Sequence, residues 1–305
     1  MAICASVIRG AARAVLIAGL AAWPAFAFAQ SVPSLALPID CEIGKACVVQ
    51  NYLDHDPGPG ARDYRCGWLS YDGHKGTDIR VIDAAALKQG VAVHAGETVI
   101  AGQKLGLVGL SGNTEFAHLH FELRHERQAV DPFASSAVGE ACQSGGQPLW
   151  AQSALDALAY VETGVLDAGI AAAPPTVGDG SVDRDRTESF IFASAAAVFW
   201  VQLYGVQAND LEELRLVAPD GRVLAARRGP IARNRAQWLA YAGVRRGNTG
   251  WIAGSYRGEY ALYRGAQRQR IISLVREIRL EAQLSARGGP DLRPDRPAHS
   301  VKGGA

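Results

Sequence analysis

The sequence lacks an excess of either charge and, beyond its first 30 residues, any long apolar run. Its 31 Lys and Arg residues almost balance 30 Asp and Glu residues, for a formal net charge of +1. So small a charge gives no field that would attract nucleic acid or an anionic membrane. A membrane-spanning helix needs about 20 consecutive apolar residues. We therefore expect no nucleic-acid partner and no membrane span beyond the N-terminal segment.

The N-terminal segment has the pattern of a secretory signal. Arg9 and Arg13 give it a positive start, residues 14–22 form a short apolar core, and residues 27–29 (Ala-Phe-Ala) match an A-x-A cleavage site. The apolar core is too short for an anchor that spans a bilayer. We therefore expect residues 1–29 to be a cleaved signal peptide and the protein to be periplasmic or secreted.

Cysteine is scarce, and its distribution agrees with export. Loss of Cys4 with the signal leaves Cys41, Cys47, Cys66 and Cys142, an even number in an oxidising compartment. Four cysteines allow three pairings. The short spacing of Cys41 and Cys47 favours a small closed loop, which would leave Cys66 for Cys142. Since no C-x-x-C pair occurs, a zinc–thiolate site is disfavoured.

The sequence after the signal is long enough for two domains of about 100–200 residues. Residues 30–67 are dense in Pro and Gly and are expected to form a loop-rich extension. Residues 68–148 alternate short apolar runs with Gly, which predicts strands, tight turns and an all-β core. Apolar residues at steps of three and four then predict a helix over residues 149–170.

A second β domain is predicted over residues 186–284, after a Pro- and Gly-rich linker at residues 171–185. Residues 219–221 (Pro-Asp-Gly) lie between two apolar runs and predict a hairpin. Short strands at such spacing are typical of a small β-sandwich. Residues 285–305 are expected to be disordered. The predicted fold class is mainly β, with an antiparallel β-sheet core followed by a β-sandwich-like domain.

Two histidine motifs carry the candidate chemistry: His74-x-x-x-Asp78 and His118-x-His120. Side chains alternate between the faces of a strand, so residues an even number apart share a face. Each motif would therefore place its two polar side chains together. H-x-H alone is more often an exposed polar face than a metal site. Its co-occurrence with a second imidazole and a carboxylate, which are usual zinc ligands, favours a metal site.

Longer stretches around these motifs resemble the lysostaphin-like (LytM-type) zinc metallopeptidases. Residues 74–79 (HKGTDI) resemble the H-x-G-x-D motif of that family. Residues 102–112 (GQKLGLVGLSG) resemble its glycine-rich approach strand, and residues 118–124 (HLHFELR) with 130–132 (VDP) resemble its closing motif. The order of the motifs and their flanking glycines agree over roughly residues 68–133. The second domain has no part in the resemblance.

The resemblance implies a duplicated hybrid motif β fold and a zinc endopeptidase of cell-wall peptidoglycan. It implies zinc held by His74, Asp78 and His120, with the fourth position left for water. His118 would lie beside that water as general base or as a hydrogen-bond partner in the transition state. Three protein ligands and an open position are what a catalytic zinc site requires.

The sequence departs from this family between the two motifs. Members carry extra strands there that end in a Tyr-x-His-Leu segment with the second catalytic imidazole, whereas here residues 81–101 join the motifs directly. We interpret this as an internal deletion, with His94 near its seam. The alternative function is a catalytically degenerate relative that binds the wall or activates a hydrolase, with a protein partner reached through the C-terminal domain. His55 is expected to be a solvated loop residue, and His125 to be exposed.

Overall fold

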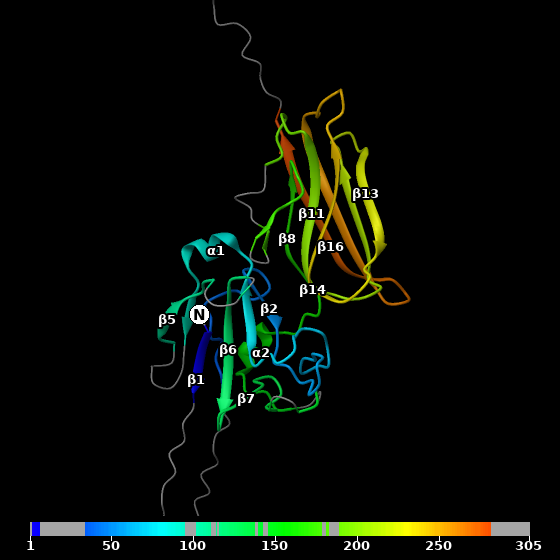
Figure 1. Cartoon of the computed structure of the whole chain (residues 1–305). Coiled ribbons are helices and arrows are strands. Elements are labelled where there is room, and N and C mark those ends of the chain that lie inside the picture. Colours follow the sequence, from blue (N-terminus) through cyan, green and yellow to red (C-terminus); the bar gives the residue numbers. More distant parts are fainter. Residues whose placement is uncertain are drawn as a thin grey trace, which may run out of the picture.

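The computed structural model of the chain describes residues 2–6, 34–94, 102–110, 114, 116–137, 140–142, 146–178, 181–182 and 189–281. Most of the expected signal peptide, the end of the expected seam at residues 95–101 and the expected tail lie outside these residues. The described chain forms two β units, one above the other in Figure 1. The prediction of a mainly β protein with antiparallel sheets and a second β domain is confirmed.

The first unit is built on one sheet with a small hairpin beside it (Figure 1). Its strands are β1 (Ala2–Ser6), β2 (Cys47–Asn51), β3 (Thr77–Val81), β4 (Ala92–His94), β5 (Lys104–Leu107), β6 (His118–His125) and β7 (Gln128–Val130). The sheet order is β1-β6-β3-β2, with β7 also paired to β6, and β4 pairs with β5. β3 is antiparallel to both β2 and β6, and β1, which lies within the expected signal peptide, runs parallel to β6.

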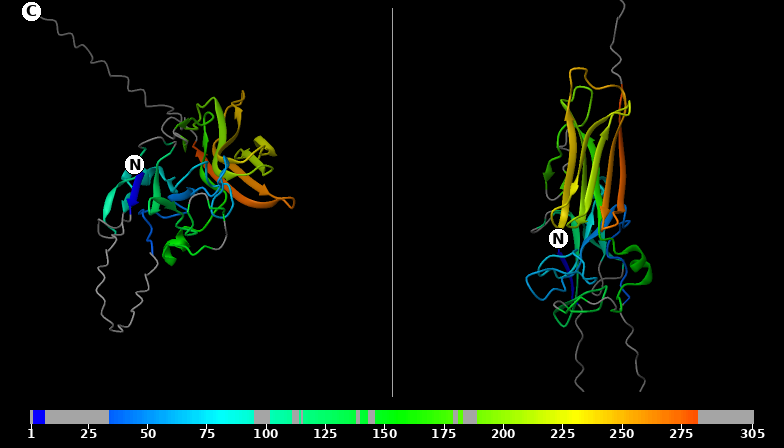
Figure 2. Two further views of the ribbon diagram at one scale, coloured as in Figure 1. Left: turned by 60° about the horizontal axis from the view of Figure 1, so that its bottom comes forward. Right: turned by 90° about the vertical axis from the view of Figure 1, so that its right-hand side faces the viewer.

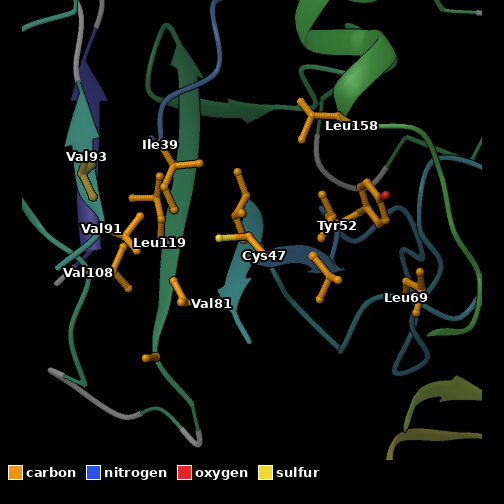
Figure 3. Packing of buried hydrophobic residues seen from close by; sticks show 14 of the residues in the cluster. Ile39, Cys47, Tyr52, Leu69, Val81, Val91, Val93, Val108, Leu119 and Leu158 are labelled. Carbon is orange, nitrogen blue, oxygen red and sulfur yellow. The ribbon is translucent and has the colours of Figure 1, made fainter. Parts of the chain in front are cut away.

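Strand alternation divides this sheet into an apolar and a polar face. Ile79 and Leu119 are register partners on β3 and β6, and both are buried in the hydrophobic core of the unit. Figure 3 shows Leu119 beside Val91 and Val108 of the β4–β5 region. Asp78 and His120 are the next register partners, so alternation directs them to the opposite face. The central pair of strands thus supports a core below and a polar cluster above.

Residues 30–67, expected to form a loop-rich extension, contribute a strand to this unit. β2 lies within them and pairs with β3, and Val48 and Val49 are buried in the same core. The short apolar run was hidden by the turn-rich residues that follow it. Those turns are held by buried Asp54 and Asp63, whose carboxylates accept backbone N–H groups of the loop. Disulfides join Cys41 to Cys47 and Cys66 to Cys142, which confirms the favoured pairing.

The predicted helix over residues 149–170 was wrong for most of its length. Helix α2 spans only Gln152–Ala157, and residues Gly164–Ala171 form strand β8. β8 pairs with the long strand β11 (Ala196–Val206), and its Leu166 and Ala168 are buried in hydrophobic cores. This long-range pairing overrides the local helical spacing. A helix that was not predicted, α1 (Ala84–Gln89), begins at Asp83, whose carboxylate accepts from the N–H groups of Ala85 and Ala86.

The second unit is the predicted β-sandwich, enlarged by β8. One sheet has the order β14-β11-β8 and the other β13-β12-β15-β16. Their remaining strands are β12 (Leu211–Val217), β13 (Val223–Pro230), β14 (Arg235–Arg245), β15 (Gly254–Arg264) and β16 (Gln269–Leu280). The predicted hairpin is confirmed: β12 pairs with β13, and Gly221 between them has φ +84°. β9 (Val177–Gly178) and β10 (Ser181–Val182) form a small ribbon within the expected linker.

The base of the sandwich packs onto the first unit, as the right view of Figure 2 shows. Tyr204 of β11 and Leu166 of β8 belong to the core of the first unit rather than to that of the sandwich. β11 is therefore covered on both faces, which explains its nearly continuous apolar sequence. At the junction, Arg264 binds Asp210 of the sandwich and Glu162 before β8. Across the described residues, no helix has the length and apolar character to span a membrane.

Candidate metal centre

The polar face of β3 and β6 gathers four predicted site residues around one carboxylate oxygen. Asp78 Oδ1 lies 2.8 Å from His120 Nδ1, 3.2 Å from His74 Nε2 and 3.5 Å from His118 Nε2. His74 Nε2 and His120 Nδ1 are 3.3 Å apart. One ligand atom each from His74, Asp78 and His120 can be chosen so that all lie within 4.8 Å of one another. Two imidazoles and one carboxylate at this separation fit a zinc ion that keeps an open coordination position.

Backbone geometry explains this convergence. Asp78 and His120 are direct register partners, and His118 follows two residues away on the same face of β6. His74 precedes β3 and reaches the cluster from the loop before it. Gly76 lies between His74 and Asp78, where a Cβ atom would be only 2.6 Å from the Phe121 carbonyl oxygen and 2.7 Å from His120 Nε2. The sequence requires glycine there because the two strands approach closely, not because of an unusual φ angle.

Strand β2 and the residue after it hold two of the candidate ligands in place. His74 Nδ1–H donates to the backbone carbonyl of Tyr52 at 2.8 Å, which leaves Nε2 directed at the cluster. The Asn51 amide donates to Asp78 Oδ2 at 2.9 Å, which leaves Oδ1 facing the imidazoles. Such outer partners fix the tautomer and orientation of metal ligands. Neither residue belongs to the sequence motifs, because only the pairing of β2 with β3 brings them to the cluster.

His118 is oriented by the residues that precede strand β6. Its Nδ1–H donates to the Phe116 carbonyl at 2.9 Å, and the Thr114 hydroxyl donates to the same carbonyl. Nε2 of His118 therefore faces the carboxylate of Asp78. The His118 side chain is 18% exposed and that of His120 is 20% exposed, whereas His74 is buried. The cluster is thus closed on the side of His74 and open to solvent on the side of β6.

Electrostatics keep the central carboxylate ionised. Burial by itself would raise the pKa of Asp78, but hydrogen bonds from His120 and His74, with the nearby charge of His74 and His118, hold that pKa well below its usual range. Beside it, burial and the charge of Asp78 raise the pKa of Tyr71 to about 12. The Tyr71 ring lies 4.3 Å from the His74 ring, so a neutral phenol borders the cluster.

Comparison with known proteins agrees with this geometry. Residues 73–132 match the family model described as Peptidase family M23. The chain carries an M23 peptidase domain. The matched segment contains all four residues of the cluster, whereas Asn51 and Tyr52 lie before it. Members of this family are zinc metallopeptidases, and His74, Asp78 and His120 of this chain form a group that could hold a metal ion.

The other comparisons add little. No curated protein matches the chain. Among solved structures, it is similar to the crystal structure of the C-terminal domain of wzt, at 11% identity over 46% of this chain and 86% of that chain. The TM-score of that superposition is 0.24, which is too low to support any statement about fold or function.

Replacing Asn51 by Ala is expected to lower the zinc affinity of the M23 domain by about 10- to 100-fold, the usual effect of losing an outer partner of a ligand. Asp78 would then lose the amide that fixes its Oδ2. Competition against a chelating dye measures the affinity. Gln128→Ala, which removes an exposed amide from β7, serves as the control. Equal affinities of Asn51→Ala and wild type would show that the contact does not support the metal.

Among the remaining histidines, His55 was wrongly predicted to be solvated. It is buried, and its Nε2–H donates to Asp131 at 2.8 Å while Nδ1–H donates to the Glu140 carbonyl at 3.0 Å. Asp131 lies 76 positions away, so no local pattern could reveal the pair. His125 is exposed, which confirms the prediction. His94 ends β4, and its side chain lies outside the described residues.

The His55–Asp131 pair is expected to make stability depend on pH. Burial opposes the charged imidazole, but the hydrogen bonds to Asp131 and the Glu140 carbonyl, together with the charges of Asp131 and Asp54, outweigh it, so the pKa of His55 is raised above 6.5. The contribution of the ionised pair is therefore fully present below about pH 6.5 and is lost as the pH rises through the folded-state pKa. In urea unfolding, the free energy of unfolding of wild type should exceed that of His55→Gln by more at pH 5.5 than at pH 9. His125→Gln is the control, and an equal difference at both pH values would contradict the prediction.

Proposed function

We propose that this protein is an exported zinc endopeptidase that hydrolyses the peptide part of cell-wall peptidoglycan. The observation that carries the proposal is the cluster of His74, Asp78 and His120 inside the M23 match, with His118 directed at the same carboxylate. Export follows from the N-terminal signal expected over residues 1–29, which would place the protein in the periplasm or outside the cell. The substrate class follows from the family.

The residues present would hold zinc through His74 Nε2, His120 Nδ1 and an oxygen of Asp78. When bound, zinc polarises a peptide carbonyl and lowers the pKa of a bound water to about 7. His120 Nδ1 must carry no proton to serve as a ligand, so a bound ion would replace the hydrogen bond between His120 Nδ1 and Asp78. His118, whose Nδ1–H is engaged by Phe116, offers Nε2 to take a proton from the attacking water and to return it to the leaving amine.

The test is zinc content and muropeptide release, measured for wild type, His120→Ala and His125→Ala. His125 lies on the same strand but is exposed, so its loss is expected to change neither quantity. Loss of an outer partner of a metal ligand costs about 10- to 100-fold in metal affinity or activity. Because His120→Ala removes a ligand itself, it should lower muropeptide release by at least about 100-fold. Release that is unaffected by His120→Ala would refute the mechanism.

A catalytically degenerate protein is the second candidate. The cluster contains the imidazoles of His74, His118 and His120. Among the described side chains, none from the region between the two motifs adds a fourth imidazole. A missing transition-state hydrogen bond costs about 100-fold or more in rate. Bound zinc without muropeptide release would favour a protein that binds the wall or activates a hydrolase. The sandwich would then supply the surface for a protein partner.

A further inference from the structure

The loop that leads into His74 presents two aromatic rings to solvent. Trp68 is 46% exposed and Tyr71 is 53% exposed, whereas Leu69 between them is buried in the core of the first unit (Figure 3). The Tyr71 ring lies 4.3 Å from the His74 ring. The guanidinium of Arg62 lies over the Trp68 ring, 3.8 Å from its centroid. The loop therefore carries a cation on an aromatic platform as well as a ring in contact with a candidate zinc ligand.

Two buried carboxylates fix this loop beside the metal centre. Asp54 accepts the backbone N–H of Arg62 at 3.0 Å and that of Gly73 at 2.9 Å. The main chain of Arg62 therefore lies next to the residue that precedes the first histidine of the cluster. Asp63 accepts three further backbone N–H groups from residues 65–69. The fold thus places the Arg62 main chain close to the cluster and holds the loop that displays Trp68.

The Arg62 side chain keeps hydrogen-bond donors for a ligand. Among the residues that the structure describes, its Nη1 donates to the Cys66 carbonyl at 3.4 Å, and no carboxylate pairs with the guanidinium. Stacking on an aromatic ring restrains a guanidinium and leaves its in-plane N–H groups free. These groups form a planar fork that binds a carboxylate through two parallel hydrogen bonds. Because the loop leads into the metal centre of a peptidase domain, the anion that fits Arg62 is a carboxylate of a peptide.

We propose that Arg62, held on Trp68, is a specificity residue that binds a free carboxylate of the substrate peptide beside the metal centre. Tyr71, in contact with His74, offers an apolar surface to the same peptide. The inference rests on the proposed function for the cleavage of that peptide, and it names the substrate class. Peptides with a free side-chain carboxylate near the bond to be cut are preferred over peptides in which that carboxylate is amidated.

The test measures binding of acetyl-Ala-Glu-Ala-Ala-amide and of its Gln counterpart, which differ by a single carboxylate. The full chain is used metal-free, because zinc itself would bind a carboxylate. Backbone ¹⁵N–H signals of residues 71–73, which are present in every variant, follow both titrations. We expect wild type to bind the Glu peptide about 5-fold more tightly, near the upper limit for an exposed ion pair. R62Q should bind the two peptides equally.

R65Q is the matched control. Arg65 lies on the same loop and its loss removes the same charge, but its guanidinium lies over Tyr160, 4.9 Å from the ring centroid. R65Q should therefore keep the preference for the Glu peptide. W68L keeps the charge of Arg62 but removes its platform, so it should lower the preference.

Equal affinities for the two peptides in wild type would overturn the proposal. An equal loss of preference in R62Q and R65Q would also overturn it, because net charge alone would then explain the effect. An unchanged preference in W68L would overturn the role of Trp68. Should R62Q fail to fold, R62K, which keeps the charge but not the planar fork, takes its place and should lower the preference.

The same variants separate this subsite from the proposed function. If the protein releases muropeptides, R62Q should raise KM with little change in kcat, because it removes binding energy that ground state and transition state share. Absence of release would bear on the proposed function, whereas the preference of the metal-free chain for the Glu peptide depends on the subsite alone.

Discussion

Gly76→Ala is expected to abolish zinc retention and to lower muropeptide release by at least about 100-fold. The new Cβ would lie 2.7 Å from His120 Nε2 and 2.6 Å from the carbonyl oxygen of Phe121. The Phe121 oxygen belongs to the strand backbone and cannot move without breaking the register of β3 and β6. Overpacking costs about 1–3 kcal/mol, and here the strain falls on a candidate ligand. His120 would be pushed away from Asp78.

The control for this substitution is Gly106→Ala. Gly106 lies in β5, has an ordinary φ, and has no atom within 4 Å of an added Cβ. The Gly106→Ala protein should keep its zinc and its activity. This control separates the steric effect at the metal centre from a general cost of adding a methyl group. Zinc per chain is measured after dialysis, with circular dichroism as the check on folding. A folded Gly76→Ala that keeps one zinc per chain would contradict the proposed ligand geometry.

The residues of the metal centre show which features local sequence could predict and which it could not. The spacing of His118 and His120 places them on one face of β6 through strand alternation alone, and the structure brings them there with Asp78 opposite. Nothing in that spacing identifies β2 as the strand beside β3. Asn51 and Tyr52 meet Asp78 and His74 only because of that pairing, so the supporting residues had to come from the structure.

The errors in the fold have the same origin. The helical spacing of Leu155, Leu158, Val161 and Val165 extends into β8, yet β8 pairs with the distant strand β11, and its Leu166 and Ala168 are buried in the cores of the first unit and of the sandwich. His55 precedes a Pro- and Gly-rich stretch typical of a solvated loop but meets Asp131 across the domain. The sandwich hairpin was predicted correctly because its turn residues and its strands are neighbours in sequence. Local periodicity therefore predicted elements and faces, and failed where distant segments decide burial.

Adding zinc to the metal-free protein is expected to raise its midpoint of thermal unfolding by on the order of 10 °C. At a free zinc concentration 1,000-fold above Kd, binding to the folded state alone stabilises by about 4.1 kcal/mol, and a domain of this size shifts by a few degrees per kcal/mol. The full increment is expected only if the unfolded chain binds zinc weakly. Both disulfides remain closed in the oxidised protein, so Cys41, Cys47, Cys66 and Cys142 offer no thiolates to compete for the ion in the unfolded state.

Asp78→Asn is expected to remove most of this increment, because it keeps the shape of the side chain but takes away the charge at the centre of the cluster. Asp72→Asn, an exposed residue of the same loop, should keep it and controls for adventitious binding to surface carboxylates. Stabilisation by zinc requires only the ligands, whereas release of muropeptides also requires the transition-state groups. A chain that gains the full increment but releases nothing would therefore have kept the metal site and lost catalysis. Equal increments in Asp78→Asn and wild type would place the zinc elsewhere.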